Sequence, residues 1–416
     1  MNRSNKSRNI AIVGCGPAGL STAIALYQSG HEVTLFERFE APQPVGSGLM
    51  LQPTGLAVLS WLGLQKQVEL LGQRIDGMLG KIANSDKVVL DIKYSTLPGE
   101  LYGVAIHRAS LFHVLYEAVL ARNIKIHTGW EICSLKYHAN SVSLIDVSQR
   151  ETSLRFDLVV DASGCQSKLL SVVKPVNKVS LEYGALWGTV KLDDHGFNRS
   201  LLEQRYRAAS VMAGVLPCGH LPGENCSLAT FFWSIKSSDY AGTVDRGIEP
   251  LKKNILQVWP EVEPLIEQIA DFSQLAHAQY SHHTMHTPYS DRIVFVGDTA
   301  HATSPQLGQG ANMALLDARA LAAALAAAPA GSDFPDTALK DYARMRRTHV
   351  RLFQTASLGL TPLYQSDSKL LPWFRDTFFQ PVSKIPVAAR LMTSLGAGLL
   401  MQPVRSIEKY EHDKGF

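Results

Sequence analysis

The sequence predicts an α/β fold around a parallel sheet, because three separate stretches read as buried strands that end in glycine turns. They are Asn9 to Glu37, Asp157 to Gly164, and Arg292 to Asp298. Each contains a short apolar run of the kind that a parallel strand buried on both faces requires. Because long segments separate them, we expect the sheet to be assembled from distant parts of the chain.

The first stretch predicts a site for an adenine dinucleotide. Its strand leads at once into Gly14-Cys15-Gly16-Pro17-Ala18-Gly19, a G-x-G-x-x-G pattern that opens a helix. Gly14 permits the tight turn, Gly16 lets backbone N–H groups approach a pyrophosphate, and Gly19 lets the helix pack closely on the strand. Pro17 suits the first helical turn. Glu37 ends the next strand, where its carboxylate can accept hydrogen bonds from the ribose. NAD and FAD fit this stretch equally well.

Composition indicates a globular enzyme. The chain has 416 residues, 46% hydrophobic and 19% charged, and a net charge of +3 without a long basic run, so a nucleic-acid partner has no electrostatic support. Its five cysteines show no C-x-x-C spacing, which favours reduced thiols and a cytoplasmic protein, although Cys218 and Cys226 could pair. No apolar run is long enough to span a membrane.

The segment after Glu37 predicts alternating elements. We expect a helix over 54–72, strands over 88–92 and 101–106, and then an amphipathic helix that Arg108 opens. Arg108 could pair with a pyrophosphate or be a solvated first-turn charge, and the sequence leaves both readings open. The runs 124–127, 131–137, 142–147 and 154–156 suggest a small antiparallel sheet.

Residues 180–290 differ in character and suggest a second sheet that could wall off a substrate. Strands are expected over 183–192, 211–216 and 227–235, with helices near 247–258 and 261–270. An Ala- and Leu-rich helix over 311–328 follows the third glycine turn, and the chain from Asp336 onward is helical, with Tyr342, Met345 and His349 on one side.

These elements predict three regions. A discontinuous nucleotide-binding domain comprises residues 1–74, 100–175 and 288–330. A substrate-binding sheet domain comprises residues 75–99 and 176–287, and a helical C-terminal region comprises residues 331–416.

Two further stretches have more than one reading. His282, His283 and His286 form H-H-x-x-H, but no carboxylate or cysteine completes a metal set, so ordinary strand histidines are expected. Residues 385–404 are apolar, and Arg390 is the one charged residue among them. A buried helix or a dimer contact is expected there, and peripheral membrane contact is the alternative.

Three segments together resemble the FAD-dependent class A monooxygenases of the aromatic, 4-hydroxybenzoate hydroxylase-like type. The first motif of that family matches Gly14, Gly16, Gly19 and Glu37, and its flavin-contacting arginine matches Arg108. Its third motif matches in full the run Gly297-Asp298-Thr299-Ala300-His301 and the run Pro305-Gln306-Leu307-Gly308-Gln309-Gly310-Ala311-Asn312. The third motif is far more specific than the first.

The resemblance implies a Rossmann-type, GR2-like FAD-binding domain with an interleaved substrate-binding sheet and a helical C-terminus. It implies that Asp298 bonds the ribityl chain, that the helix starting near Gly310 points N–H groups at the flavin pyrimidine ring, and that Pro305 lies beside the flavin edge where oxygen reacts. The implied non-covalent FAD contacts are Gly14, Gly16, Pro17, Ala18, Gly19, Glu37, Arg38, Arg108, Asp298, Pro305, Gly308, Gly310, Ala311 and Asn312.

The implied activity is hydroxylation of an aromatic substrate, such as a phenol, an indole or a quinone precursor, free or tethered to a carrier. NADPH or NADH would reduce FAD, and a flavin C4a-hydroperoxide would transfer one oxygen atom; the protein would be a monomer or a homodimer. Two alternatives remain. A flavin-dependent halogenase would need the tryptophan motif of which Trp233 is a fragment and a lysine such as Lys81. A non-oxygenating flavoenzyme, such as a prenyl-type reductase, can carry the same Asp-Ala-Ser-Gly motif as residues 161–164.

The middle motif departs from the family pattern. Gly164 and Ser167 match, but Ser163 replaces the expected acid and Leu170 replaces the expected arginine. Because that motif is linked to NAD(P)H engagement, the choice between NADH, NADPH and a separate reductase stays open.

Overall fold

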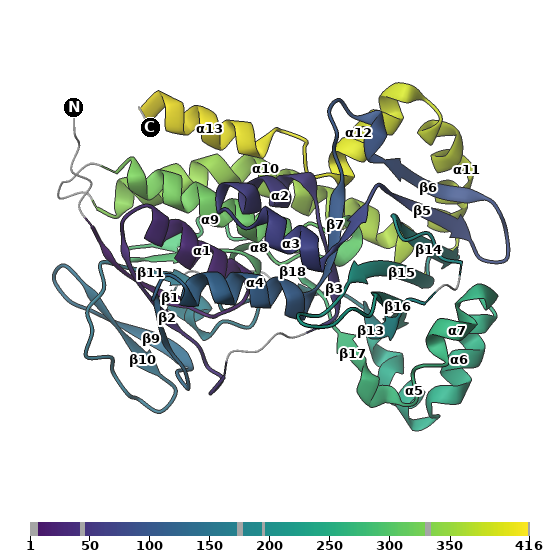
Figure 1. Ribbon diagram of the computed structural model, residues 1–416, viewed down its shortest axis with the longest axis horizontal. Coiled ribbons are helices and arrows are strands. Elements are labelled where there is room, and N and C mark those ends of the chain that lie inside the picture. The colour runs from purple at the N-terminus through teal and green to yellow at the C-terminus, as the bar shows by residue number, and fades with distance from the viewer. Residues whose placement is uncertain (1–6, 42–45, 173–177, 194–195, 329–333, 415–416) are drawn as a thin grey trace.

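The computed structural model describes residues 7–41, 46–172, 178–193, 196–328 and 334–414. Two large sheets lie side by side, and the long helix α10 (Asp336–Tyr364) runs across both (Figure 1). The mixed α/β architecture that the sequence predicts is confirmed. Both helix α10 and the helices that follow it belong to the predicted helical C-terminal region.

The first sheet carries the three glycine turns. Its strand order is β19 (Tyr289–Ser290), β20 (Ile293–Phe295), β11 (Leu158–Asp161), β1 (Asn9–Val13), β2 (Glu32–Phe36) and β8 (Lys125–His127). All neighbours are parallel except β19 and β20. The carboxyl ends of β1, β11 and β20 therefore meet at one edge, which is where parallel sheets bind ligands.

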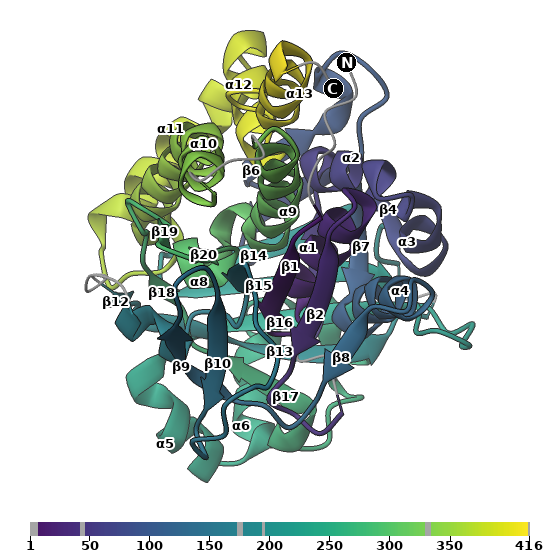
Figure 2. The ribbon, with the colours of Figure 1, turned by 90° about the vertical axis from the view of Figure 1, so that its left-hand side faces the viewer.

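Both faces of this sheet are covered, which explains its apolar strands. One face packs against α1 (Pro17–Gln28), α4 (Arg108–Leu120) and α9 (Gly310–Ala326). The other face packs against the antiparallel pair β9 (Ile132–Tyr137) and β10 (Val142–Asp146), as Figure 2 shows. Alternate residues of β1 divide between the two cores, Ile10 and Ile12 on one side and Ala11 and Val13 on the other.

A three-stranded antiparallel sheet links the two large sheets. It consists of β3 (Gly48–Leu51), β7 (Gly103–His107) and β4 (Gln73–Ile75). The helix expected over 54–72 is wrong in one respect, because the chain forms two helices, α2 (Pro53–Trp61) and α3 (Gln65–Leu71). They part at Gly63, whose φ of +77° a helix cannot accommodate.

The second large sheet has seven strands. Their order is β17 (Leu275–Ala278), β13 (Tyr183–Lys191), β16 (Leu228–Lys236), β15 (Val211–Gly219), β14 (Leu201–Arg207), β5 (Gly77–Ile82) and β6 (Val88–Lys93). Its outer face packs against α6 (Ile248–Leu256) and the residues around α7 (Glu263–Ile266), below the sheet in Figure 1, with α5 (Tyr240–Asp245) beside them. Strands β5 and β14 were not expected, because glycine interrupts one and charged residues dominate the other.

Three other expectations need correction. The antiparallel sheet is only the pair β9 and β10: residues 125–127 form the parallel edge strand β8, and Phe156 makes one isolated bridge. The helix expected over 261–270 is reduced to α7, because Pro260 and Pro264 restrict it. The C-terminal helices α11 (Leu370–Ser383), α12 (Pro386–Gly396) and α13 (Pro403–Lys414) complete the chain, and α12 is largely exposed rather than buried.

A buried charged cluster joins the first sheet to α9 and α10. Asp317 accepts hydrogen bonds from the backbone N–H of Gly297 at 2.8 Å and from Arg346 at 2.6 Å, and it lies 2.6 Å from His301 Nε2. Burial raises the pKa of this carboxyl, but His301 and Arg346 outweigh burial and hold the pKa below its usual range. His349 lies 3.3 Å from Arg346, and burial together with the arginine charge lowers the pKa of this imidazole to about 3.

His349 should make the protein sensitive to acid. Its pKa is about 3 in the folded protein and about 6.5 in the unfolded chain, so only the unfolded chain binds the proton between these values. The free energy of unfolding must then fall as pH drops below 6.5. Between about pH 7.5 and about pH 5.5 we expect His349→Asn to lose about 1.4 kcal/mol less than the wild type in urea titrations. His286→Asn, at an exposed position, should keep the wild-type slope, and an unchanged slope in His349→Asn would contradict this account.

Candidate flavin site

The glycine turn after β1 is shaped by close contacts. Gly14 has a φ of +101°, and a Cβ there would lie 2.8 Å from the carbonyl oxygen of Ala162. A Cβ on Gly19 would lie 1.9 Å from the Gly14 carbonyl oxygen, so glycine is needed for α1 to pack this closely. Gly16 differs, because nothing lies within 4 Å of the place that its Cβ would take. No side chain caps α1, so the backbone at Gly16 is accessible to an anion.

Glu37 is buried at the end of β2 and braces the same turn. Its Oε2 accepts a hydrogen bond from the Cys15 N–H at 2.8 Å, and its Oε1 accepts one from the Phe39 N–H at 3.2 Å. Burial and the charge of Glu37 raise the pKa of the Cys15 thiol. Each oxygen of Glu37 retains capacity to accept a ribose hydroxyl. Arg38 points outward and stacks on Phe39, with 4.6 Å between the guanidinium carbon and the ring centre.

The turn after β20 brings the first turns of two helices together. Gly297 has a φ of +60°, and a Cβ there would lie 3.0 Å from that of Ala18 in α1 and 3.3 Å from that of Ala314 in α9. Asp298 is exposed, and its Oδ1 lies 3.8 Å from the place that a Cβ on Gly310 would take. A ligand at this point would meet both the Asp298 carboxylate and the positive end of the α9 dipole.

Asn312 connects α9 to β3 within the protein. Its Oδ1 accepts the Gln52 N–H at 2.8 Å, and its Nδ2 donates to the carbonyl oxygens of Met50 and Gly308 at 3.1 Å and 2.9 Å. The side chain of Asn312 therefore positions the Gly308 turn. What this residue offers a cofactor is its backbone at the start of α9.

Gln52 has an unpartnered donor beside that turn. The Tyr94 hydroxyl donates to its Oε1, which fixes the orientation of the amide. Its Nε2 has no hydrogen-bond partner in the described part of the chain, although Gln52 is fully buried. This atom lies 3.8 Å from the place that a Cβ on Gly308 would take. The sequence analysis did not select Gln52 or Tyr94, because neither belongs to a glycine motif.

Arg108 presents an exposed charge at the start of α4. His107 caps this helix, because its Nδ1 accepts the Ala109 N–H at 3.2 Å. Burial and the charge of Arg108 lower the pKa of His107, which is neutral at pH 7. The Arg108 side chain lies along Gly46, where a Cβ would come within 2.9 Å of its Cδ. In the described ranges no acidic side chain pairs with Arg108, so its charge is available to a pyrophosphate.

The middle motif is held together by Asp161, to which the sequence pattern assigns no role. Asp161 is fully buried and accepts hydrogen bonds from the Ser163 N–H at 3.0 Å and from the hydroxyls of Ser163 and Ser167. Burial raises the pKa of this carboxyl, although these donors oppose that effect. Leu170 packs against the core, and the Nζ of Lys178 donates to the Cys165 carbonyl at 3.0 Å.

The Pro305 turn is anchored to α10. The Ser304 hydroxyl lies 2.7 Å from that of Ser357 and 2.8 Å from that of Thr361. Gly308 closes the turn in the left-handed conformation, with its N–H donating to the Pro305 carbonyl at 2.9 Å. Pro305 itself is half-buried.

The inner face of the seven-stranded sheet is turned toward these elements. The Gly48 N–H of β3 donates to Thr230 Oγ1 at 2.7 Å, and His107 Nε2 lies 3.2 Å from Thr189 Oγ1. Since side chains alternate along a strand, the register of β13, β16, β15 and β14 places twelve residues in the three central rows of this face. We call them the inner wall: Thr189, Thr230, Leu216 and Leu202; Trp187, Phe232, Gly214 and Gln204; Ala185, Ser234, Met212 and Tyr206. The face continues to Lys191 and Lys236 at its two ends, where Lys236 pairs with Asp367.

The inner wall contains no charged side chain, and one of its residues, Trp187, is hydrogen-bonded to a tyrosine hydroxyl that can still donate its own proton. Trp187 packs against Phe232, with ring centres 4.8 Å apart and planes tilted by 35°, and it donates its indole N–H to the Tyr280 hydroxyl at 2.7 Å. Burial raises the pKa of Tyr280, which therefore remains a phenol. Its own proton has no acceptor in the described residues, so Tyr280 can donate to a ligand oxygen.

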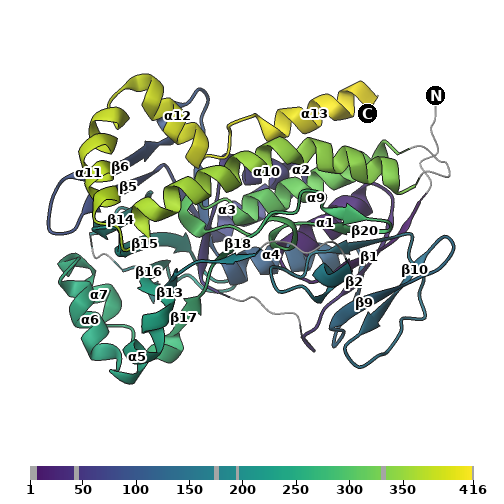
Figure 3. The ribbon, with the colours of Figure 1, turned by 180° about the vertical axis from the view of Figure 1, so that it is seen from behind.

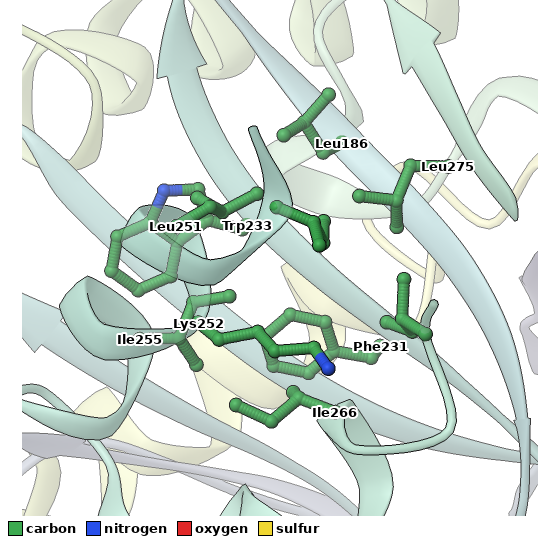
Figure 4. A pocket seen from close by; sticks show the side chains of 10 residues that line it. Leu186, Phe231, Trp233, Leu251, Lys252, Ile255, Ile266 and Leu275 are labelled. Atoms are coloured by element: carbon green, nitrogen blue, oxygen red, sulfur yellow. The ribbon is translucent and has the colours of Figure 1, made fainter. Parts of the chain in front are cut away.

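The residues that suggested a halogenase lie on the outer face. Trp233 packs with Phe231 against Leu251 and Ile255 of α6 around a void of about 10 Å³, which holds no more than a water molecule (Figure 4). Lys81 pairs with Asp86 at 2.9 Å. These are the ordinary roles that a core tryptophan and a surface lysine take.

The histidine run is engaged elsewhere. His282 Nδ1 lies 3.2 Å from the Gln354 amide oxygen, and His283 Nε2 lies 3.0 Å from the Thr299 carbonyl. Burial lowers the pKa of both imidazoles. His282 and His283 therefore attach the loop before β19 to α10 and α8 (Asp298–His301).

These features fit FAD. Gly16 and the uncapped start of α1 can receive a pyrophosphate, Glu37 a ribose, Asp298 a ribityl hydroxyl, and the Nε2 of Gln52 can donate to a carbonyl of the flavin ring. When bound, FAD supplies the redox chemistry and the activation of oxygen.

Replacing Gly16 should weaken FAD binding, whereas replacing Gly19 should weaken the fold. Gly16→Ala adds a methyl group into open space, so unfolding of the apoprotein should change by less than about 0.5 kcal/mol while the FAD dissociation constant rises at least about tenfold. Gly19→Ala meets a backbone oxygen and should destabilise the fold by about 3 kcal/mol or more. Urea titration and FAD fluorescence quenching measure the two quantities. Gly359→Ala, in open space within helix α10, should leave the FAD dissociation constant unchanged and stabilise the fold by no more than about 1 kcal/mol through helix propensity. Tight FAD binding by Gly16→Ala would refute the assignment.

Comparison with known proteins identifies the family of this chain. Residues 7–357 match the family model for the FAD binding domain. The aurachin C monooxygenase/isomerase of Stigmatella aurantiaca is 25% identical over 93% of this chain and 97% of its own length, and the 2-heptyl-3-hydroxy-4(1H)-quinolone synthase of Pseudomonas aeruginosa is 24% identical over 93% and 98%. The structure of Klebsiella pneumoniae HpxO with FAD and uric acid superposes with a TM-score of 0.78 at 17% identity, covering 96% of this chain and 100% of that one. The chain belongs to the FAD-binding-domain family of class A flavoprotein monooxygenases.

Proposed function

We propose that this monooxygenase inserts one oxygen atom into a neutral, lipophilic aromatic ring, with NADPH or NADH as the reductant. The observation that carries the proposal is the inner wall, in which none of the twelve positions is charged. A benzoate-type substrate would need a cation against its carboxylate, because burying an unpaired charge is costly. An uncharged ring is therefore the better fit.

Two relatives support this class of substrate. The name of the Pseudomonas aeruginosa enzyme specifies a quinolone that carries a heptyl chain, and the Stigmatella aurantiaca enzyme is named for aurachin C. Both cover nearly the whole chain. We infer a substrate of this kind, a fused or substituted ring with a carbonyl or hydroxyl group and an apolar substituent.

In the proposed mechanism, the protein binds, orients and shields. Trp187 and Phe232 pack against the ring, and the Tyr280 hydroxyl donates to its oxygen. The Pro305 turn and the inner wall exclude water from the reacting centre. Asp298 would bind the ribityl chain, and the start of α9 would hold the flavin ring in place. We assign reductant binding to the loop of Ser163 and Lys178, and we place the protein in the cytoplasm, in keeping with five free cysteines.

Substrate selectivity tests the proposed function. The FAD-loaded enzyme is mixed anaerobically with NADPH or NADH and then with oxygen, in the presence of a neutral 2-alkyl-4-quinolone or of 3-hydroxybenzoate. We expect flavin reduction by at least one nucleotide and a kcat/KM at least about 100-fold higher for the quinolone, which is about 2.7 kcal/mol of discrimination. Preference for the carboxylate would reject the substrate class. Failure of both nucleotides to reduce the flavin would mean that a separate reductase is needed.

The Tyr280 hydroxyl should contribute to substrate binding. Tyr280→Phe removes one hydrogen bond to the substrate, so KM should rise about tenfold, or about 1.4 kcal/mol, while FAD affinity stays unchanged. Tyr240→Phe, on the outer face where the ring stacks on His277, is the matched control. Equal KM values for wild type and Tyr280→Phe would exclude this role.

A further inference from the structure

A band of apolar side chains is exposed on α11 and α12. Among the described residues, eight of the eighteen exposed large apolar side chains fall within 370–391. We call these eight the apolar band: Leu370, Trp373, Phe374, Phe378, Val382, Ile385, Val387 and Leu391. Leu370 and Val387 are each 77% exposed, and Trp373 is 62% exposed. A contiguous apolar surface of this kind marks an interaction site.

The orientation of α11 exposes the band to solvent. Leu370, Phe374, Phe378 and Val382 recur every four residues, so they form one stripe along α11 that points away from the protein. The opposite side of the helix is fixed by Arg375, which is fully buried and donates to the carbonyl oxygens of Leu363 and Ala208 at 2.9 Å and 3.1 Å.

Neighbouring rings support one another within the band. The rings of Phe374 and Phe378 lie 4.9 Å apart, and those of Trp373 and Phe378 lie 6.2 Å apart. Figures 1 and 3 show α11 and α12 at one end of the molecule beside β5 and β6. The aromatic side chains are therefore presented together at one end of the protein.

Positive charges flank the band. Lys369, Lys384 and Arg390 are exposed, and none has an acidic partner in the part of the chain that the structure describes. The one acid within the band, Asp376, pairs with Arg375 at 2.7 Å. Aromatic and aliphatic side chains with Lys and Arg at their margins are the composition of helices that lie in the surface of an anionic bilayer.

We propose that the apolar band docks the enzyme onto an anionic lipid surface. A second copy of the chain fits less well, because a twofold interface would place the three cations near their own counterparts without any anion between them. In the described residues no helix is long and apolar enough to cross a membrane, so the contact is peripheral. The buried helix expected over 385–404 is wrong because Ile385, Val387 and Leu391 face solvent.

The docking surface is joined directly to the flavin site. Gln309, at the start of α9, donates from its Nε2 to the carbonyl oxygen of Gly396 at the end of α12, at 2.7 Å. Thr393 of α12 lies 3.2 Å from Thr96, which follows β6. A docked enzyme would thus have its site connected through α12 to the surface that contacts the lipid phase, where lipophilic aromatic molecules collect. Docking itself does not depend on the identity of the substrate.

Vesicle flotation of the FAD-loaded enzyme tests the proposal. We expect binding to vesicles of phosphatidylcholine mixed with phosphatidylglycerol, and weak binding to phosphatidylcholine alone. The double variant Trp373→Ser/Phe378→Ser should bind at least tenfold more weakly. The triple variant Lys369→Gln/Lys384→Gln/Arg390→Gln should bind roughly 100-fold more weakly, at about fivefold for each cation. Raising the salt from about 0.1 M to about 1 M should weaken the wild type but not the triple variant.

Matched controls separate docking from misfolding. Leu70→Ser, at an exposed apolar position on α3, should bind like the wild type. FAD content and turnover of a dissolved substrate should stay unchanged in every variant, so a failure of the proposed activity is seen separately. Equal binding of wild type and the double variant would overturn the proposal. So would a wild-type dimer that does not float with vesicles and that Trp373→Ser/Phe378→Ser converts to a monomer.

Discussion

The site depends on one close approach, in which the first turns of α1 and α9 meet at Gly297. Gly297 has a φ of +60°, which favours glycine, and a Cβ there would press on Ala18 and Ala314 at 3.0 Å and 3.3 Å. Glycine at this position therefore suits the close approach of the two helices. Asp317 fixes the arrangement by accepting the Gly297 N–H while it binds Arg346 of α10. The result is a single region of positive backbone potential, which suits the two negatively charged parts of one extended cofactor.

In the proposed function, the seven-stranded sheet would supply substrate selectivity beside the FAD site. Its outer face is an ordinary hydrophobic core with α6 and α7, whereas the inner wall combines aromatic rings with a few hydroxyl and amide groups. Because none of those inner groups is charged, discrimination between ligands must come from shape, from desolvation and from a donor such as Tyr280. The apolar band at the far end of the same molecule is consistent with a protein that handles lipophilic molecules.

Much of the cofactor region could be predicted from the sequence because its constraints are local. Gly14, Gly19 and Gly297 are required by contacts with nearby backbone or helices, and such glycines appear as short motifs. The same is true of α4, which begins at Arg108, and of α9, which begins at Gly310. The assignment of individual FAD contacts and the limits of the three regions remain predictions.

The remaining features depend on contacts between distant segments, which a single sequence does not display. Gln52 meets Tyr94 and Asn312, and Trp187 meets Tyr280, across long separations in the chain. Asp161 supports the serines of the middle motif from a position where an acid was not expected. Charged residues interrupt the apolar pattern of strand β14, so its own sequence did not reveal it. Its parallel partner β5 lies far away in the sequence. The exposure of α11 and α12 contradicts their apolar composition.

The most direct measurement of the central claim is isotope incorporation from ¹⁸O₂ by the FAD-loaded enzyme supplied with reduced nicotinamide and a neutral alkyl quinolone. The account predicts a product that carries one ¹⁸O atom on the aromatic ring, with the other atom of oxygen released as water. A product that carries no label would contradict it. So would oxygen consumption that yields only hydrogen peroxide with every neutral aromatic compound while carboxylated rings are labelled.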